Sequence, residues 1–324
     1  MVMARPPPDP LFTLRGSAAP VNTLHFHCSR AGRPLLYSGS EKGCVHVWNL
    51  NNRRAEHVLE GHDGASVIWV STVTSMDAFL SQGRDMRVCV WDLHEGRNTI
   101  THSLHTGSVG FCQCSLLEAE TNKTLLALPA EHTEEIKVME LDSQTPVRSL
   151  IPDSKQGMLM CMKMFQADSG PLLCAGYEDG SLVLWDVSHG RPLSCLKAHP
   201  EPVMCLDFDT DKQKGISGSS DKTLTSWTID SQQNLQMQNS VLLTNPGVSQ
   251  LCIRADGKIV AAAGWDGSVR VFGWKRLKPL AVLQHHKDLV HSVAFSNHPE
   301  PSQRLMAAGS KDQRISVWSI YSES

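Results

Sequence analysis

Histidine, aspartate and hydroxyl side chains recur along this chain at spacings that acid–base chemistry could use. A histidine held by a carboxylate can act as a general base toward a nearby hydroxyl. The sets are His62 with Ser81 and Asp85, His199 with Ser217 and Asp221, and His286 with Asp312. Because they occupy matching positions of a repeat, they are better explained as scaffold than as active sites. We therefore predict that the protein is not an enzyme.

Two short segments carry potential metal ligands. They are His25-Phe26-His27-Cys28 and Cys112-Gln113-Cys114, and both are expected on strands. Alternation places His25 and His27 on one face and Cys28 on the other, and neither spacing matches a common zinc pattern. The chain has no G-x-x-x-x-G-K-[ST] phosphate loop, and Gly257-Lys258 fits an ordinary tight turn. We expect no metal and no cofactor.

The residues described above lie in a repeated sequence pattern of a turn followed by a strand. An apolar strand that ends in tryptophan follows a turn rich in Gly, Asp and Ser in LSQGRDMRVCVWDL, AGYEDGSLVLWDV, ISGSSDKTLTSWTI and AAGSKDQRISVWSI. With a first copy at Trp48 and degenerate copies at Met139 and Phe272, the repeats are 42 to 48 residues apart. This period with Trp-Asp endings is typical of WD40 repeats. We predict an all-β, seven-bladed WD40 β-propeller with four short antiparallel strands in each blade.

In this fold the repeated polar residues form a buried hydrogen-bonded chain within a blade. A loop His, a strand Ser or Thr, a turn Asp and the strand Trp take part, and the chain is favourable only when every member is satisfied. The expected members are His62, Ser81, Asp85 and Trp91 in blade two; His199, Ser217, Asp221 and Trp227 in blade five; and His286, Asp312 and Trp318 in blade seven, where Ala308 replaces the hydroxyl. Blades one, three, four and six lack the chain and must depend on apolar packing.

The propeller accounts for nearly the whole sequence. Residues 1–9 form a short proline-rich tail, and residues 10–321 form one propeller domain. Blade seven lacks a strand at the C-terminal end, and residues 10–15 read as a strand without a blade. We expect this N-terminal strand to complete blade seven, which removes an open sheet edge. Blade three, about residues 100–145, is degenerate and is expected to be the least rigid, with 116–135 as a long acidic insertion.

Loop residues beside the turn aspartates are the candidates for a protein-binding surface. A propeller presents its top face through these loops, and the candidates are Trp265, Arg84, Glu178, Ser220, Lys311, Glu41 and Lys42. Exposed Trp and Arg dominate interface energies, so Trp265 is the most informative of them. Two interpretations of Trp265 remain open at this point: a contact residue, or local packing on a neighbouring loop. The charged candidates also fit solvated loop tips.

Composition limits the partners and the compartment. The chain has 30 Lys plus Arg against 33 Asp plus Glu, a net charge of −3, which argues against direct nucleic-acid binding. No apolar run approaches the length of a membrane span, and the proline-rich start does not resemble a secretory signal. We expect a protein of the cytoplasm and nucleus that has no membrane partner. Its ten cysteines are expected to be free thiols.

Several segments carry a resemblance that a generic repeat does not explain. Besides AGYEDGSLVLWDVS and AAGSKDQRISVWS, the chain contains SVGFC and LTNPG. In these it resembles the WD40 family that includes the fungal ASTRA-associated proteins. The resemblance implies a non-enzymatic adaptor that acts with the TTT co-chaperone in the maturation and stability of phosphatidylinositol-3-kinase-related kinases. It supplies no set of binding residues.

Two other functions compete with this adaptor role. The propeller alone is compatible with a peptide reader, such as a ubiquitin-ligase substrate receptor or a chromatin reader. A reader needs a concentrated pocket at the centre of the top face, with an aromatic cage or an Arg cluster. An enzyme would need convergent titratable groups. We expect no G-protein γ subunit as partner, because no long helix precedes the first strand to form a coiled coil, and we expect a monomer.

Overall fold

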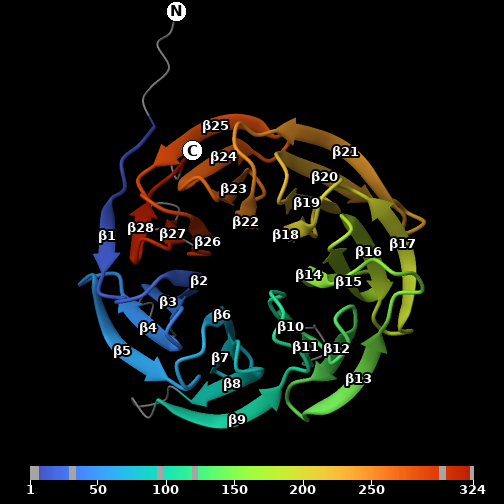
Figure 1. Ribbon diagram of the computed structural model, residues 1–324, viewed down its shortest axis with the longest axis horizontal. Helices are drawn as coiled ribbons and strands as arrows, with labels where there is room; N and C mark the ends of the chain where they lie inside the picture. Colours follow the sequence, from blue (N-terminus) through green and yellow to red (C-terminus); the bar gives the residue numbers. More distant parts are fainter. Residues whose placement is uncertain (1–6, 29–33, 93–97, 119–122, 299–303, 322–324) are drawn as a thin grey trace, which may run out of the picture.

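The computed structural model describes residues 7–28, 34–92, 98–118, 123–298 and 304–321. In this part of the chain, 28 strands form seven four-stranded antiparallel sheets, arranged as blades around one axis (Figure 1). The predicted all-β, seven-bladed propeller is therefore confirmed. The first six residues of the proline-rich tail and Glu120 of the acidic segment lie outside the described residues. Within the described residues, no helix is long and apolar enough to span a bilayer.

The first four blades follow the chain in order, each running from the axis outward. Blade one consists of β2 (Val21–Cys28), β3 (Pro34–Ser40), β4 (Cys44–Asn49) and β5 (Arg54–Glu60). Blade two consists of β6 (Val67–Val73), β7 (Ala78–Gly83), β8 (Arg87–Asp92) and β9 (Thr99–His105). Blade three consists of β10 (Ser115–Glu118), β11 (Thr124–Pro129), β12 (Ile136–Glu140) and β13 (Thr145–Leu150). Blade four consists of β14 (Leu159–Ala167), β15 (Gly170–Tyr177), β16 (Ser181–Asp186) and β17 (Arg191–Lys197).

The remaining three blades bring the chain back to its start. Blade five consists of β18 (Val203–Asp209), β19 (Lys214–Ser219), β20 (Thr223–Ile229) and β21 (Leu235–Leu242). Blade six consists of β22 (Val248–Ile253), β23 (Ile259–Gly264), β24 (Ser268–Gly273) and β25 (Lys278–Gln284). Blade seven consists of β26 (Val290–Phe295), β27 (Met306–Ser310), β28 (Arg314–Trp318) and, on the outside, β1 (Phe12–Arg15).

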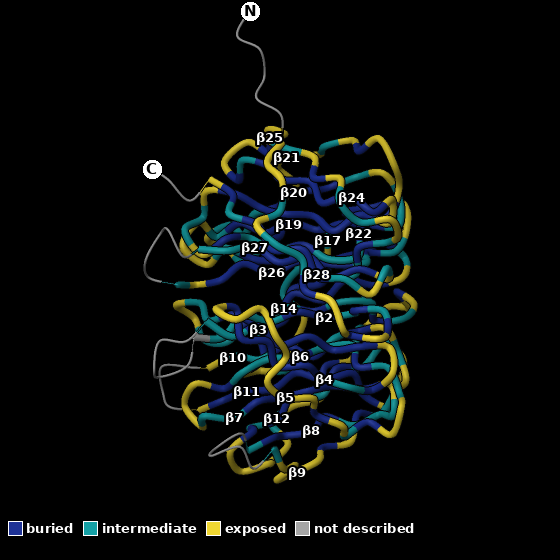
Figure 2. Tube along the Cα trace, turned by 90° about the vertical axis from the view of Figure 1, so that its left-hand side faces the viewer, coloured by how far each residue is buried: buried dark blue, intermediate teal, exposed yellow. Residues whose placement is uncertain are grey.

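Burial within a blade follows the position of each strand. The second strand is covered on both faces by the neighbouring blades, so all six residues of β11, β19 and β23 are buried. Figure 2 shows the buried residues inside the molecule and the exposed ones mainly in the outer turns. The outermost strand faces solvent, and β5 and β9 each bury a single residue. The apolar cores lie between blades: Tyr37 of blade one stacks on Phe79 of blade two with ring centres 4.4 Å apart. Each blade is therefore stable only beside its neighbours.

The N-terminal strand closes the ring. Strand β1 pairs with β28 from Phe12 opposite Val317 to Arg15 opposite Arg314. Leu14 is buried in a core shared by blades seven and one. The buried Arg254 of blade six donates hydrogen bonds to the carbonyl oxygens of Ile320 and Tyr321, at 2.8 and 3.2 Å, and so holds the segment that follows β28. This pairing confirms the prediction that the strand near residues 10–15 completes blade seven.

A repeated irregularity identifies the tryptophan position in the degenerate blades. The pairing of the third and fourth strands shifts register directly before Trp48, Trp91, Trp185 and Trp227. The same shift occurs directly before Met139 in blade three and before Phe272 in blade six. A bulge of this kind bends and twists the strand at a fixed point. Met139 and Phe272 are therefore the structural equivalents of the tryptophans, as the spacing predicts.

Blade three departs from the expected layout. Strands β10 and β11 take up residues 116–118 and 124–129 of the acidic segment 116–135, so that segment is not one long insertion. Glu118 is not merely solvated, since its carboxylate accepts hydrogen bonds from the backbone N–H groups of Thr74 and Ser75 at 2.9 and 3.2 Å. The expectation that Cys112 and Cys114 lie on a strand is wrong. Both precede β10, and the Gln82 side chain bonds the Cys112 carbonyl and the Cys114 N–H in place of a strand partner.

Candidate functional site

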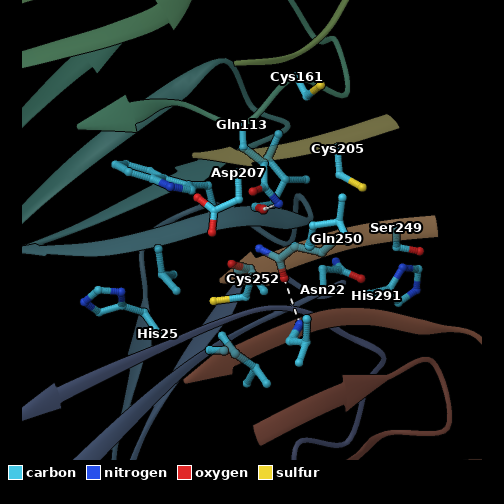
Figure 3. Close-up of a pocket in the computed structure, with 18 of the residues that line it drawn as sticks. Asn22, His25, Gln113, Cys161, Cys205, Asp207, Ser249, Gln250, Cys252 and His291 are labelled. Carbon is cyan, nitrogen blue, oxygen red and sulfur yellow. Dashed lines mark hydrogen bonds between the residues drawn. The ribbon is translucent and has the colours of Figure 1, made fainter. Parts of the chain in front are cut away.

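A cavity of about 830 Å³ runs along the axis, lined chiefly by the inner strands of the blades. Figure 3 shows part of its wall, with His25 and Asp207 toward one side of the view and Asn22, Ser249 and His291 toward the other. A cavity of this size, with apolar walls and a few polar groups, is the default place to look for a binding site.

Several polar groups on or next to this wall join one blade to the next. Their partners are backbone groups of the neighbouring inner strand, at 2.8–3.3 Å. The bonds run from Asn22 Nδ2 to Val67 O, Gln113 Nε2 to Ile68 O, Met164 N to Ser115 Oγ, Ile253 N to Asp207 Oδ2, Val293 N to Gln250 Oε1, and Leu24 N to Ser292 Oγ. Between blades four and five, the Lys163 ammonium pairs with Asp207 at 2.9 Å. The middle of the cavity therefore uses its polar chemistry to hold the ring closed.

Burial shifts the pKa values of two titratable groups on the wall toward their neutral forms. Burial, with a smaller contribution from His27, lowers the pKa of His25 to about 4, and its Nε2 lies 2.9 Å from the Thr72 hydroxyl. Burial, followed by nearby Asp207, raises the pKa of the Cys252 thiol to about 12. A nucleophilic cysteine needs the opposite shift. Among the described residues, no three His, Cys, Asp or Glu side chains converge as metal ligands.

One end of the cavity opens between the loops that precede the third strands. Of the seven surface candidates, the structure brings four to this opening: Glu41, Arg84, Trp265 and Lys311 line the cavity. Glu178, Ser220 and Lys42 do not line it, and the Glu178 carboxylate is occupied by the Met158 N–H at 3.1 Å. We call the four residues at the opening, together with Phe111, the mouth surface.

Phe111 is the member of the mouth surface that sequence reasoning missed. It belongs to the SVGFC segment, is 58% exposed, and lies under the guanidinium of Arg84, whose central carbon is 4.6 Å from the ring centre. An Arg over an aromatic face is a cation–π contact that keeps the charged group accessible. The segment was distinctive in the sequence, but nothing in its spacing places it opposite Arg84.

Local packing on a neighbouring loop, one of the two interpretations of Trp265, is present in the structure, whereas a contact with a partner stays a prediction. One face of the indole lies against Gly247 of the LTNPG segment, so close that a Cβ there would fall 2.1 Å from the ring. Gly247 also has a positive φ of 88°, which favours glycine. The remaining 39% of Trp265 is exposed and lines the cavity. Packing on the neighbouring loop therefore positions the ring, and its exposed part lies at the cavity.

Comparisons with known proteins agree with this geometry. A family model described as "WD domain, G-beta repeat" matches residues 8–49, 190–228, 239–273 and 277–319. The chain is 50% identical over 322 residues to guanine nucleotide-binding protein subunit beta-like protein 1 of Mus musculus, with 98% of this chain and 97% of that protein covered. ASTRA-associated protein 1 is 29% identical in Schizosaccharomyces japonicus and 25% identical in Schizosaccharomyces pombe, each over 97% of this chain and 99% of the relative.

The chain belongs to the WD40-repeat family. Its relatives match from end to end, so the comparison covers all seven blades and not one repeat. A WD40 propeller is a scaffold on which binding sites are built from loops, and this chain resembles the ASTRA-associated members of that family.

The WD40 hydrogen-bonded chain is present in blade two with all four expected members. Trp91 Nε1 donates to Ser81 Oγ at 2.8 Å, Ser81 lies 2.8 Å from His62 Nε2, and His62 Nδ1 lies 3.0 Å from the Asp85 carboxylate. Trp can only donate and an ionised Asp only accept, so Ser81 donates to Nε2 and Nδ1 carries the proton. His62 and Ser81 are fully buried.

Blade five departs from the expected chain at both ends. His199 Nε2 lies 2.8 Å from Ser217 Oγ, but its Nδ1 reaches the Thr223 hydroxyl at 2.9 Å, which in turn donates to Asp221 at 2.7 Å. Trp227 is buried with no hydrogen-bond partner for its indole N–H among the described residues. Gly215 stands opposite Trp227, where blade two has Phe79, and the indole occupies the space that a Cβ would fill. The ring therefore lies away from Ser217.

Blades seven and six replace missing members by other residues. In blade seven Ala308 lacks the expected strand hydroxyl. The Oγ of Ser316, the cross-strand partner of Ala308, takes its place and lies 2.8 Å from both His286 Nε2 and Trp318 Nε1. In blade six Arg270 reaches the turn Asp266 with two hydrogen bonds. Burial raises the pKa of Asp266, but the hydrogen bonds from Arg270, Asn245 and the Ser268 N–H, with the charge of Arg270, together lower it to about 2. Blade one keeps the bond from Trp48 Nε1 to Ser38 Oγ at 2.8 Å. That Ser316 takes the place of the missing hydroxyl can be read only from the cross-strand register, not from the repeat spacing.

Acid is expected to destabilise this WD40 propeller through its buried histidines. Burial lowers the pKa of His199 to about 4, although Asp221 opposes the shift, whereas an unfolded histidine titrates near about 6.5. Between those values the unfolded chain binds the extra proton. The free energy of unfolding should therefore fall as the pH drops through this window, on the order of 1 kcal/mol per pH unit for this residue. Urea unfolding followed by tryptophan fluorescence at several pH values measures the slope.

Two variants isolate the contribution of His199. His199→Gln removes the titrating ring and should flatten the slope. Ser217→Ala removes the partner hydroxyl but keeps the ring, so it should lower stability across the range and preserve the slope. Equal slopes in the wild type and in His199→Gln would contradict the assignment.

Proposed function

We propose that the protein is a non-enzymatic WD40 adaptor that acts with the TTT co-chaperone in the maturation and stability of phosphatidylinositol-3-kinase-related kinases, in the cytoplasm and nucleus. The family resemblance and the name of the fungal relatives, ASTRA-associated protein 1, support this role. The observation that carries it in the structure is the mouth surface. An exposed Trp, an exposed Phe and an Arg gather at one opening, and these residue types dominate protein interfaces.

A pull-down of the tagged full-length chain from cells tests the adaptor role. We expect to recover TTT subunits together with one or more of the large kinases, and we expect kinase levels to fall when the protein is depleted. Trp265→Ala should weaken recovery severalfold, because the indole offers a rigid apolar face to a partner. Leu280→Ala on β25 is the matched control, since Leu280 is also 39% exposed but lies on an outermost strand.

A second candidate is a peptide reader, and the same surface favours it. Aromatic rings and an Arg at the opening of a central cavity are what such a reader requires. Recovery of a cullin adaptor or of histones, with the kinases absent and their levels unchanged on depletion, would favour the reader over the adaptor. Intact recovery of every partner by Trp265→Ala would remove Trp265 from the site.

A further inference from the structure

The charges of the mouth surface are not balanced within the protein. The cavity is lined by three cations and two carboxylates, and Lys163 and Asp207 pair with each other away from the opening. Arg84 and Lys311 are exposed, and within the described part of the chain neither forms an ion pair. Glu41 is the one carboxylate among the lining residues at the opening, and Asp288 lies nearby, since Asp288 and Lys311 both act on His291. The lining residues at the opening therefore carry one net positive charge, on a chain whose net charge is −3.

Two groups near the opening, His291 and Asp266, do not neutralise these cations. Burial lowers the pKa of His291, which lines the cavity between Glu41 and Lys311, so its ring is neutral at physiological pH and adds hydrogen-bonding capacity and no charge. The other acidic loop residue close to Trp265 is Asp266, whose carboxylate is already bonded by Arg270 and by Asn245 Nδ2 at 2.7 Å. Arg84 and Lys311 remain available to anions from outside.

The two aromatic rings are held so that each presents a free face or edge. Trp265 is fixed from behind by Gly247, and Phe111 is fixed from one side by Arg84. Val109, in the same segment as Phe111, is 54% exposed. The SVGFC and LTNPG segments, which the repeat pattern does not require, thus contribute to one opening. Rings that are held in place lose little conformational entropy when a partner binds.

We infer that the mouth surface binds an extended segment of a partner protein in which acidic side chains flank an apolar or aromatic one. This inference rests on the proposed role as a protein-interaction scaffold and names the chemistry of the segment that it would hold. Arg84 and Lys311 pair with the carboxylates, and Trp265 with Phe111 receives the apolar side chain. The contacts come from blades six, seven, one, two and three, which suits an extended segment better than a single side chain.

Replacing Glu41 should change the affinity for an acidic segment in the opposite direction from replacing Arg84 or Lys311. It lies on blade one, between Lys311 of blade seven and Arg84 of blade two. A carboxylate there repels an acidic segment, since like charges at short range are unfavourable. Glu41→Gln should therefore tighten binding, whereas Lys311→Gln and Arg84→Gln should weaken it. A purely structural role for these exposed residues would not produce opposite signs.

Photo-crosslinking of the full-length protein identifies the segment. The crosslinking amino acid p-benzoylphenylalanine replaces Phe111, which is 58% exposed and tolerates the added ring, and Leu280 on β25 serves as the control position. After irradiation in cells, mass spectrometry identifies the partner peptide. We expect a crosslink at position 111 to a segment of net negative charge that contains an aromatic or large aliphatic residue. No crosslink there, or a neutral or basic segment, overturns the inference.

Binding of that segment as a fluorescein-labelled peptide then tests the individual contacts. We expect Arg84→Gln and Trp265→Ala each to weaken binding about tenfold or more, with Glu41→Gln tightening it and added salt weakening it. Lys278→Gln on β25 removes the same charge from an outer strand and should change nothing. Equal affinity in the wild type and Arg84→Gln overturns the inference.

The two proposals fail in different ways. If the wild type recovers TTT and the kinases but position 111 crosslinks to no acidic segment, the adaptor function stands and the mouth surface is not its site. If the wild type recovers neither TTT nor the kinases but position 111 crosslinks to an acidic segment of another protein, the inference stands and the proposed function fails.

Discussion

His62→Ala is expected to lower the free energy of unfolding by about 3 kcal/mol. The ring is fully buried and joins Ser81 to Asp85, so its loss leaves a buried hydroxyl without its acceptor and a largely buried carboxylate with fewer donors. Leaving a buried polar group unsatisfied costs about 1–3 kcal/mol, and more for a charged group. Arg87 still bonds Asp85 at 2.8 Å, which limits the damage. Chemical unfolding at pH 7.5 measures the difference.

His102→Ala is the matched control for this prediction. His102 lies exposed on the outer strand β9 of the same blade, so the same change of residue removes no buried partner. Its effect should stay within about 0.5 kcal/mol, as for most surface substitutions. If the two variants lose similar stability, the hydrogen-bonded chain does not stabilise blade two.

Leu14→Ala is expected to lower the free energy of unfolding by about 2–5 kcal/mol, because it removes buried apolar contacts where the ring of blades closes. Leu14 is 1% exposed and packs in the core shared by blades seven and one, with Ile315 and Val317 of the paired strand. The protein should unfold at a lower temperature and aggregate more readily, since a loosened β1 exposes the edge of β28. Thermal unfolding with light scattering measures both effects.

Leu11→Ala provides the comparison within the same segment. Leu11 is 54% exposed and still donates its backbone N–H to Val317 O at 2.8 Å, so the truncation removes no buried contact. Its stability should match that of the wild type closely. A Leu14→Ala protein as stable as Leu11→Ala would show that closure does not depend on the buried face of β1.

Both predictions concern parts of the protein that are separate from the mouth surface. The polar groups of blade two and the apolar core at the closure are satisfied inside the propeller. At the mouth surface Trp265 is 39% exposed, and within the described residues the exposed Arg84 and Lys311 form no ion pair. Substitutions of the buried residues should change stability. Substitutions at the mouth surface should change binding with little effect on stability.

The repeat alone predicted the architecture because each blade depends on local patterns. The spacing of the Trp48-type positions, the alternation within strands and the unpaired N-terminal strand determined seven blades and their closure. The same spacing placed Met139 and Phe272 correctly, although neither is a Trp, because the bulge before each is a backbone feature of the repeat. The members of the blade-two chain were also predictable, since all lie at fixed offsets from Trp91.

Contacts between blades could not be predicted in this way, because they join residues far apart in the sequence. Trp274 is one example: it is fully buried, donates to Asp209 of blade five at 2.7 Å, and carries the Lys214 ammonium 4.2 Å from its ring centre. Ser316 replaced a hydroxyl because it lies across the strand pair from Ala308, and Trp227 left its expected partner because Gly215 gave it room.

The position of the candidate binding surface depends on the sequence repeat and on the packing between blades. The sequence by itself determined which loops reach the top face and that Arg84, Trp265, Lys311 and Glu41 stand at their tips. Only the tertiary structure decided that these four meet at one opening while Glu178, Ser220 and Lys42 do not, and that Phe111 joins them. The physical reason is that a repeat determines each position along its own blade, whereas the direction of a loop side chain depends on the neighbouring blade against which it packs.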